Sequence, residues 1–198
     1  MVGLLGLHLA CGENDNGDDG DYEYEIEISG DSHSLDGGYA DWVKDAFPGQ
    51  VNNDFARAGT TTNDWLPGAG RIEGLVRVPR VVAILLGTND TWRTNNTPDE
   101  VVGNLKKIIH YYFKLGASRI VLSTPPPWPE SQPQYAKRLR STADAIREFC
   151  LVPNDDIDCG PDLNRLLGPE HMEAGGIHMN ALGHQLFAEE LIPLLEAQ

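Results

Sequence analysis

Four short blocks of the sequence carry side chains that could perform nucleophilic chemistry. They are Gly30-Asp31-Ser32, Ala56–Gly59, Gly87–Asp90 and Gly176–Asn180. A serine hydroxyl becomes a good nucleophile only when a base such as histidine removes its proton. The tetrahedral intermediate of acyl transfer then needs preorganised neutral donors, such as an asparagine amide or a backbone N–H that glycine leaves accessible. The blocks together contain all of these groups, so acyl transfer is the chemistry that they indicate.

The segments between the blocks predict strands that alternate with helices. Alternating or continuous apolar runs predict strands, and apolar residues at helical spacing between Pro and Gly predict helices. The predicted strands are 22–29, 51–56, 81–87, 118–124 and a short one in 155–159, and the predicted helices are 37–47, 98–116, 134–149 and 180–196. This alternation indicates an α/β fold with a parallel sheet between two helical layers. The blocks follow the strand ends, where such folds place their ligand sites.

In this order, the four blocks resemble those of the SGNH, or GDSL-type, hydrolase superfamily, over a region from about Tyr22 to the C-terminus. The resemblance implies a three-layer αβα sandwich with a flavodoxin-like parallel sheet of about five strands. It also implies that Ser32 is the nucleophile and His178 the general base. The N–H groups of Gly59 and Ser32 and the side-chain amide of Asn89 would form the oxyanion hole. No cofactor or metal is implied.

One position departs from the pattern of this superfamily. Its members usually have an aspartate three residues before the catalytic histidine, and Gly175 occupies that position here. The aspartate normally fixes the histidine tautomer and stabilises the imidazolium. We predict a Ser32–His178 dyad in which Nδ1 of His178 faces a backbone carbonyl within 173–176. The carboxylate of Glu173 is the alternative third member.

Other side chains near the blocks have simpler interpretations. We interpret His184 as a packing residue at the start of the last helix, and we expect His33 to point away from the nucleophile. Asp90 is expected to hold its own loop, and His171 has no partner pattern. The histidines at 171, 178 and 184 lack the spacing of metal ligands.

Three tryptophans suggest the class of substrate. Trp65, Trp92 and Trp128 follow the second block, the third block and the fourth predicted strand, so we expect them to surround the site. Flat indoles suit sugar faces, whereas a hydrolase of long acyl chains needs an aliphatic groove. Short-chain esters on carbohydrate are the predicted substrates. The alternatives are a lysophospholipase- or thioesterase-type lipid hydrolase, a glycan-binding protein with weakened catalysis, and a flavodoxin-like binding protein.

The composition excludes several partners. The 198 residues contain 15 Lys+Arg and 30 Asp+Glu, a net charge of −15, which argues against nucleic acid and anionic lipid headgroups as partners. No run of 18 apolar residues is present, so no membrane-spanning helix is expected. The predicted partner is a small-molecule or glycan ester, and the sequence specifies no oligomeric state.

The N-terminal region and the cysteines suggest export. Residues 1–21 read as an apolar leader followed by an acidic tether, ahead of a hydrolase domain over 22–198. Ala10 followed by Cys11 resembles the end of a bacterial lipoprotein signal, so Cys11 is a candidate lipid anchor and the protein a candidate envelope lipoprotein or exported enzyme. The pair Cys150 and Cys159 could form a disulfide or remain two buried thiols. The strand 22–29 is expected to have polar side chains that are partly exposed or covered by the tether.

Overall fold

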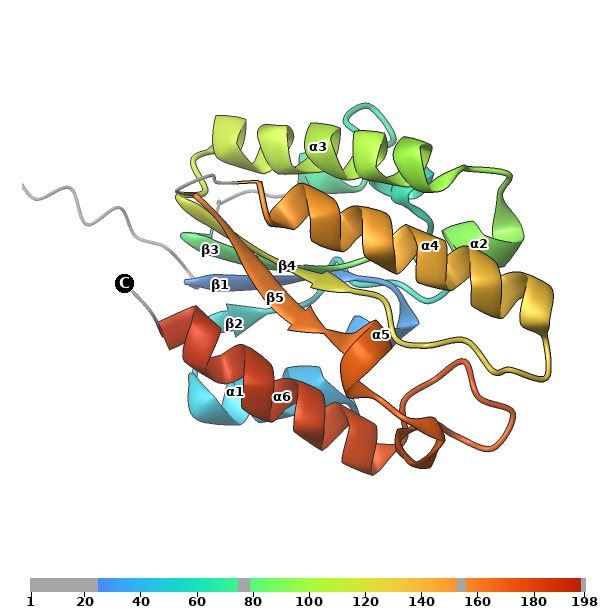
Figure 1. The fold of residues 1–198 in the computed structure, drawn as a ribbon. Helices are drawn as coiled ribbons and strands as arrows, with labels where there is room; N and C mark the ends of the chain where they lie inside the picture. The colour runs from blue at the N-terminus through green and yellow to red at the C-terminus, as the bar shows by residue number, and fades with distance from the viewer. Residues whose placement is uncertain (1–24, 75–78, 153–155, 197–198) are drawn as a thin grey trace, which may run out of the picture.

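The computed structural model describes residues 25–74, 79–152 and 156–196, and shows a parallel five-stranded sheet in the order β2-β1-β3-β4-β5. The strands are β1 (Ile26–Gly30), β2 (Val51–Asn52), β3 (Val81–Leu85), β4 (Arg119–Thr124) and β5 (Ile157–Asp162). The helices are α1 (Tyr39–Ala46), α2 (Asp90–Arg93), α3 (Pro98–Leu115), α4 (Pro133–Cys150), α5 (Leu163–Leu166) and α6 (Ala181–Glu196). Helices α3 and α4 cover one face and α1 and α6 the other (Figure 1). The predicted three-layer sandwich is confirmed.

The central strand β3 shows how the core forms on both faces of the sheet. Its side chains alternate, so that Val81, Ala83 and Leu85 pack towards α1 and α6. Val82 and Ile84 pack towards α3 instead. A strand that is buried on both faces has a continuous apolar sequence, which explains why this segment was recognisable without any alternation.

The strand β1 differs from its prediction. We expected polar side chains that are partly exposed or covered by the tether. All five residues are buried because β1 lies inside the sheet, between β2 and β3, and the tether lies outside the described residues. Ser29 Oγ forms a 2.6 Å hydrogen bond with Tyr112 Oη of α3. Glu27 Oε2 accepts a 2.7 Å hydrogen bond from Asn52 Nδ2. Burial raises the pKa of Glu27 to about 8.

The predicted strand 51–56 is shorter than expected and ends at Asn52. The next residue, Asn53, turns its amide back to donate 3.0 Å hydrogen bonds to Ser34 O and Asp36 Oδ1. Side chains of this type compete with the backbone for hydrogen bonds and favour turns over strands. The chain is thereby free to form the loop that carries Gly59.

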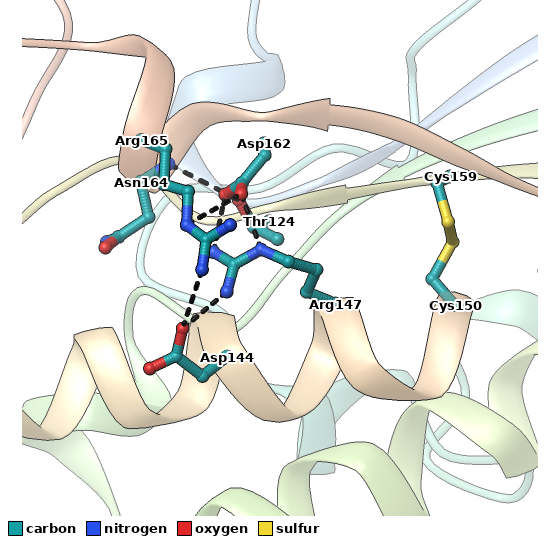
Figure 2. Close-up of polar contacts among 8 residues, drawn as sticks. All are labelled: Thr124, Asp144, Arg147, Cys150, Cys159, Asp162, Asn164 and Arg165. Carbon is teal, nitrogen blue, oxygen red and sulfur yellow. Dashed lines mark hydrogen bonds and ion pairs between the residues drawn. A yellow bond between two sulfur atoms is a disulfide. The ribbon is translucent and has the colours of Figure 1, made fainter. Parts of the chain in front are cut away.

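The edge of the sheet at β5 is cross-linked to α4. Cys150 and Cys159 form a disulfide, which decides between the two alternatives left by the sequence. Asp162 accepts 2.6 Å and 3.0 Å hydrogen bonds from Arg147 and one of 2.8 Å from Thr124 (Figure 2). Although burial raises it, these hydrogen bonds and the charge of Arg147 bring the pKa of Asp162 below its usual value. These contacts fix the position of Asp162, the last residue of β5, from which the chain continues to His178.

Within the described ranges, no helix has the length and apolar character needed to cross a membrane. Cys11 and the leader lie outside the described residues.

Candidate active site

The four sequence blocks meet beyond the carboxyl ends of the strands. Ser32 follows β1, Gly59 lies in the loop after β2, Asn89 follows β3, and His178 lies between α5 and α6. Because parallel strands end at the same edge of a sheet, this topology brings distant segments together.

Ser32 and His178 are in direct contact. Ser32 Oγ lies 3.0 Å from His178 Nε2, which is hydrogen-bond distance. Ser32 begins a short 3-10 turn, Ser32–Ser34, and Asp31 caps this turn by accepting a 3.1 Å hydrogen bond from His33 N. The cap orients the backbone that presents the hydroxyl to the imidazole. This pair has the geometry of a nucleophile and its base.

Glu173 reaches the other side of the imidazole. Met172 and Met179 form an isolated antiparallel bridge, and Glu173 N donates a 2.8 Å hydrogen bond to His178 O. The hairpin places the two side chains next to each other, with Glu173 Oε2 at 3.9 Å from His178 Nδ1. In the described part of the chain, no backbone carbonyl accepts a hydrogen bond from Nδ1, so the structure differs from the predicted carbonyl-backed dyad. The carboxylate takes the place that we expected a carbonyl to occupy.

The tip of this hairpin explains the absence of the usual aspartate. Gly175 and Gly176 have φ values of +102° and +77°, which side chains of L-residues rarely adopt. A Cβ at Gly176 would lie 2.8 Å from Pro129 Cγ, whereas one at Gly175 would meet nothing within 4 Å. Glycine at 175 is therefore required by the backbone of the tip, and the acidic side chain sits on the strand-like part at Glu173.

The loop after β2 presents Gly59 in a conformation that also requires glycine, with φ at +74°. A Cβ there would collide with Nη1 of Arg93. Arg93 donates a 2.5 Å hydrogen bond to Gly59 O, and Arg57 N donates a 3.1 Å hydrogen bond to Gly30 O. These contacts hold the loop beside the nucleophile turn.

The Asn89 amide is oriented by three neighbours. Nδ2 donates to Thr60 O at 3.0 Å and to Asp31 Oδ2 at 3.2 Å. Oδ1 accepts a 3.2 Å hydrogen bond from Trp92 Nε1. If the amide were flipped, Oδ1 would face the oxygens of Thr60 and Asp31, and Nδ2 would face the Trp92 N–H. These partners therefore fix the orientation of the amide. An oxyanion would share the Nδ2 donors with Thr60 and Asp31.

Asp31 and Asp90 are buried carboxylates next to the site. Burial raises the pKa of Asp31 to about 7, and the neighbouring Asp90 adds to this, although the His33 N–H lowers it. Asp90 accepts hydrogen bonds from Thr62 N at 2.9 Å and Thr62 Oγ1 at 2.6 Å. It therefore joins the loops after β2 and β3, in agreement with its predicted structural role.

The other histidines do not compete for the role of base. His33 packs its ring against His178, with 5.4 Å between ring centroids, and burial together with the nearby histidines lowers its pKa to about 3. His184 Nδ1 accepts a 3.1 Å hydrogen bond from Tyr39 N, which makes it a packing residue. His171 Nδ1 accepts a hydrogen bond from Gly168 N.

The tryptophans occupy three different environments. Trp65 is completely buried under the loop, where it packs with α3 and donates a hydrogen bond to Thr60 Oγ1, so its predicted place around the substrate is wrong. Trp92 is 46% exposed and holds Asn89. Trp128 lines a cavity of about 570 Å³ that also includes Glu173. A tryptophan that is close to such a loop in sequence can therefore pack beneath the loop, against the protein core.

The described residues contain no group of three His, Cys, Asp or Glu side chains that could hold a metal ion. The sequence did not reveal Asp31 and Thr60 as supports of Asn89, because contacts between loops from different strands leave no local pattern. It also missed the arginines beside Gly59, whose common cavity appears only in the fold.

Comparisons with known proteins agree with this geometry. The model of the GDSL-like lipase/acylhydrolase family matches residues 17–186. No curated sequence matches the chain significantly. Similar solved structures include an acetyl-xylooligosaccharide esterase from Geobacillus stearothermophilus (20% identity, TM-score 0.67, covering 87% of this chain and 94% of that one). A carbohydrate esterase family 3 protein from Talaromyces cellulolyticus has 14% identity and a TM-score of 0.72, with 87% and 96% covered. A lipase/acylhydrolase from Enterococcus faecalis has 23% identity and a TM-score of 0.69, with 87% and 95% covered.

Proposed function

This chain belongs to the GDSL-like lipase/acylhydrolase family, and from that premise we propose that it is a serine esterase that removes short acyl groups from a carbohydrate. The observation that carries the proposal is the 3.0 Å contact between Ser32 Oγ and His178 Nε2. The orientation of Asn89 and the positive φ of Gly59 support an oxyanion hole on the same edge of the sheet.

The reaction proceeds in two steps. Ser32 Oγ attacks the ester carbonyl carbon while His178 Nε2 takes its proton, and the alcohol leaves with that proton to give an acyl-serine. Water then attacks the acyl-serine with His178 again as base, and the acid and free Ser32 are released. In both steps the N–H groups of Gly59 and Ser32 and the Asn89 amide stabilise the negative oxygen. Glu173 stabilises His178 while it carries the proton.

The substrate class rests on the cavity beside the His178 hairpin. Its volume of about 570 Å³ and its wall of Trp128, neighbouring prolines, Leu167 and Met172 suit a small ester with an apolar face. Carbohydrate esterases among the similar structures support a sugar as the alcohol. The apolar lining also favours a second candidate, hydrolysis of lipid or thioester substrates.

Hydrolysis of p-nitrophenyl esters from acetate to dodecanoate tests the proposal. Ser32→Ala should reduce turnover to background, and Asn89→Ala should lower kcat by about 10²–10³ with less change in KM. Ser141→Ala is the control, because Ser141 is an exposed serine of α4 outside both cavities. A rate that rises towards dodecanoate would favour the lipid hydrolase. No Ser32-dependent turnover on any ester would contradict the esterase and favour a glycan-binding protein.

We also propose that the protein is exported. The Cys150–Cys159 disulfide supports this location, because such bonds persist in oxidising compartments. Metabolic labelling with a fatty acid should mark the protein through Cys11, and Cys11→Ser should abolish the label. Label that persists in this variant would contradict the anchor.

A further inference from the structure

Three arginines gather around a second cavity, next to the loop that carries Gly59. The cavity has a volume of about 620 Å³, and its charged wall residues are Arg57, Arg71, Arg93 and Asp64. This local excess of positive charge occurs in a chain with 15 Lys+Arg and 30 Asp+Glu. Positive side chains that cluster in a strongly acidic protein indicate a place for a negatively charged group.

Among the residues that the structure describes, no carboxylate forms an ion pair with these arginines. Arg71 Nη1 donates to Phe55 O at 2.8 Å and Arg93 Nη1 donates to Gly59 O at 2.5 Å, which are contacts with neutral carbonyls. Arg57 makes no side-chain hydrogen bond to any described residue. Each guanidinium has five N–H donors, so most of these donors stay available.

Asp64 supplies only part of the counter-charge, because one carboxylate that attracts Arg71 and Arg93 faces three guanidinium groups in the same wall. Asp64 Oδ2 accepts hydrogen bonds from Thr61 N at 2.7 Å and from Thr61 Oγ1 at 2.8 Å, and caps the turn at Thr62–Trp65. Burial and the nearby positive charge of Arg57 lower the pKa of the Arg71 guanidinium, although the charge of Asp64 partly offsets them. The two arginines therefore repel each other, and an anion bound between them would relieve that repulsion.

We propose that this cavity binds a carboxylate on the alcohol part of the ester, so that the substrate is an acylated sugar acid. This inference rests on the proposed esterase function. Gly59 lines the cavity and is also the residue whose N–H we assign to the oxyanion hole, so a group bound there can belong to the molecule being hydrolysed. Guanidinium groups bind carboxylates through paired hydrogen bonds. The acidic wall at Asp64 favours a singly charged group over a doubly charged phosphate.

The two cavities differ in charge. The cavity that includes Trp128 and Leu167 borders the His178 hairpin, and its wall also carries Glu130, Arg140 and Glu173, so two carboxylates face a single arginine there. The arginine cavity is polar and borders the oxyanion loop, so it accepts the sugar acid.

Binding can be measured without turnover in the Ser32→Ala protein. Calorimetric titration with methyl glucuronoside should give a dissociation constant at least tenfold lower than with methyl glucoside, and 0.5 M NaCl should weaken the difference. Arg57→Gln in the same background should raise the dissociation constant for methyl glucuronoside about tenfold, as expected for the loss of one charged hydrogen-bonding partner. Arg80→Gln is the control, because Arg80 is an exposed arginine outside the cavity whose carboxylate partner is Glu25 at 3.6 Å. Equal affinity for the two sugars would overturn the proposal, as would tighter binding of inorganic phosphate or sulfate.

Kinetics separate this inference from the esterase proposal. With active enzyme, kcat/KM should be at least tenfold higher for acetylated methyl glucuronoside than for acetylated methyl glucoside. Arg57→Gln should remove this preference and leave p-nitrophenyl acetate hydrolysis within twofold of wild type. Equal hydrolysis of both sugars would overturn the carboxylate site while the esterase stands. If neither ester is hydrolysed, the esterase proposal fails, and the titration still decides whether the cavity binds a carboxylate.

Discussion

Replacement of Glu173 with glutamine tests how the imidazole is supported when the usual aspartate is absent. The carboxylate lies 3.9 Å from His178 Nδ1, and the two side chains are 60% and 43% exposed. Two charges about 4 Å apart interact by about 1 kcal/mol in water and about 4 kcal/mol at an effective dielectric constant of 20. Because solvent screens this exposed pair, the value in water applies, about 1 kcal/mol. We therefore expect Glu173→Gln to lower kcat by about fivefold.

The effect should appear in kcat rather than KM. In the proposed mechanism His178 gains positive charge when it takes the proton of Ser32, so Glu173 would stabilise the transition state more than bound substrate. Steady-state hydrolysis of p-nitrophenyl acetate measures both constants, and 0.5 M NaCl should reduce the difference between wild type and variant. Glu170→Gln is the matched control, because Glu170 lies in the same segment, 3.5 Å from His171 rather than from His178. A kcat of Glu173→Gln within twofold of wild type, or an equal loss in the control, would refute this role.

Three further predictions concern the fold. Gly175→Asp, which introduces the usual aspartate, should lower both the melting temperature and kcat, because φ is +102° there; higher activity would contradict the assigned backbone strain. Glu27 has a folded-state pKa of about 8 against an ordinary 4.5, so its contribution to the free energy of unfolding is lost as pH rises from 4.5 to 8, by up to about 1.4 kcal/mol per pH unit. Urea titrations at several pH values give the free energy of unfolding as a function of pH. This free energy should depend less on pH in Glu27→Gln than in wild type, and an equal dependence would refute the raised pKa of Glu27. Reduction of the Cys150–Cys159 disulfide, whose cysteines are 9 residues apart, should lower the free energy of unfolding by about 3 kcal/mol, with the doubly Ser-substituted protein insensitive to reductant.

The strands and helices were predictable where one physical rule dominates. The buried strand β3 has a continuous apolar sequence, and α3 begins at Pro98 after a Thr97–Glu100 capping box and ends at Gly116 with positive φ. The strand β1 was harder, because Glu27 and Ser29 are polar but buried. Their burial depends on Asn52 and Tyr112, which no local pattern connects to them.

The candidate site was predictable as a set of residue types but not as a set of contacts. The blocks at strand ends led to Ser32 and His178, and the structure brings these two together. Glu173 lies beside His178 because the chain between them forms a hairpin whose tip contains two glycines. The separation of five residues between Glu173 and His178 did not by itself predict this contact. Trp65 was misplaced because proximity in sequence to Gly59 does not show which side of the loop an indole occupies.

The hydrogen bond between Ser32 and His178 joins residues 146 positions apart, and this separation governs when activity can arise during folding. Ser32 follows the first strand, whereas His178 directly precedes α6, whose Phe187 packs on Tyr39 of α1 with 4.3 Å between ring centroids. Contacts between distant segments close large loops and form slowly. A chain synthesised from its N-terminus thus contains the proposed nucleophile and oxyanion loop long before the proposed base. On this assignment, ester hydrolysis would report the docking of the last helix, and partly folded chains with a formed sheet would be inactive.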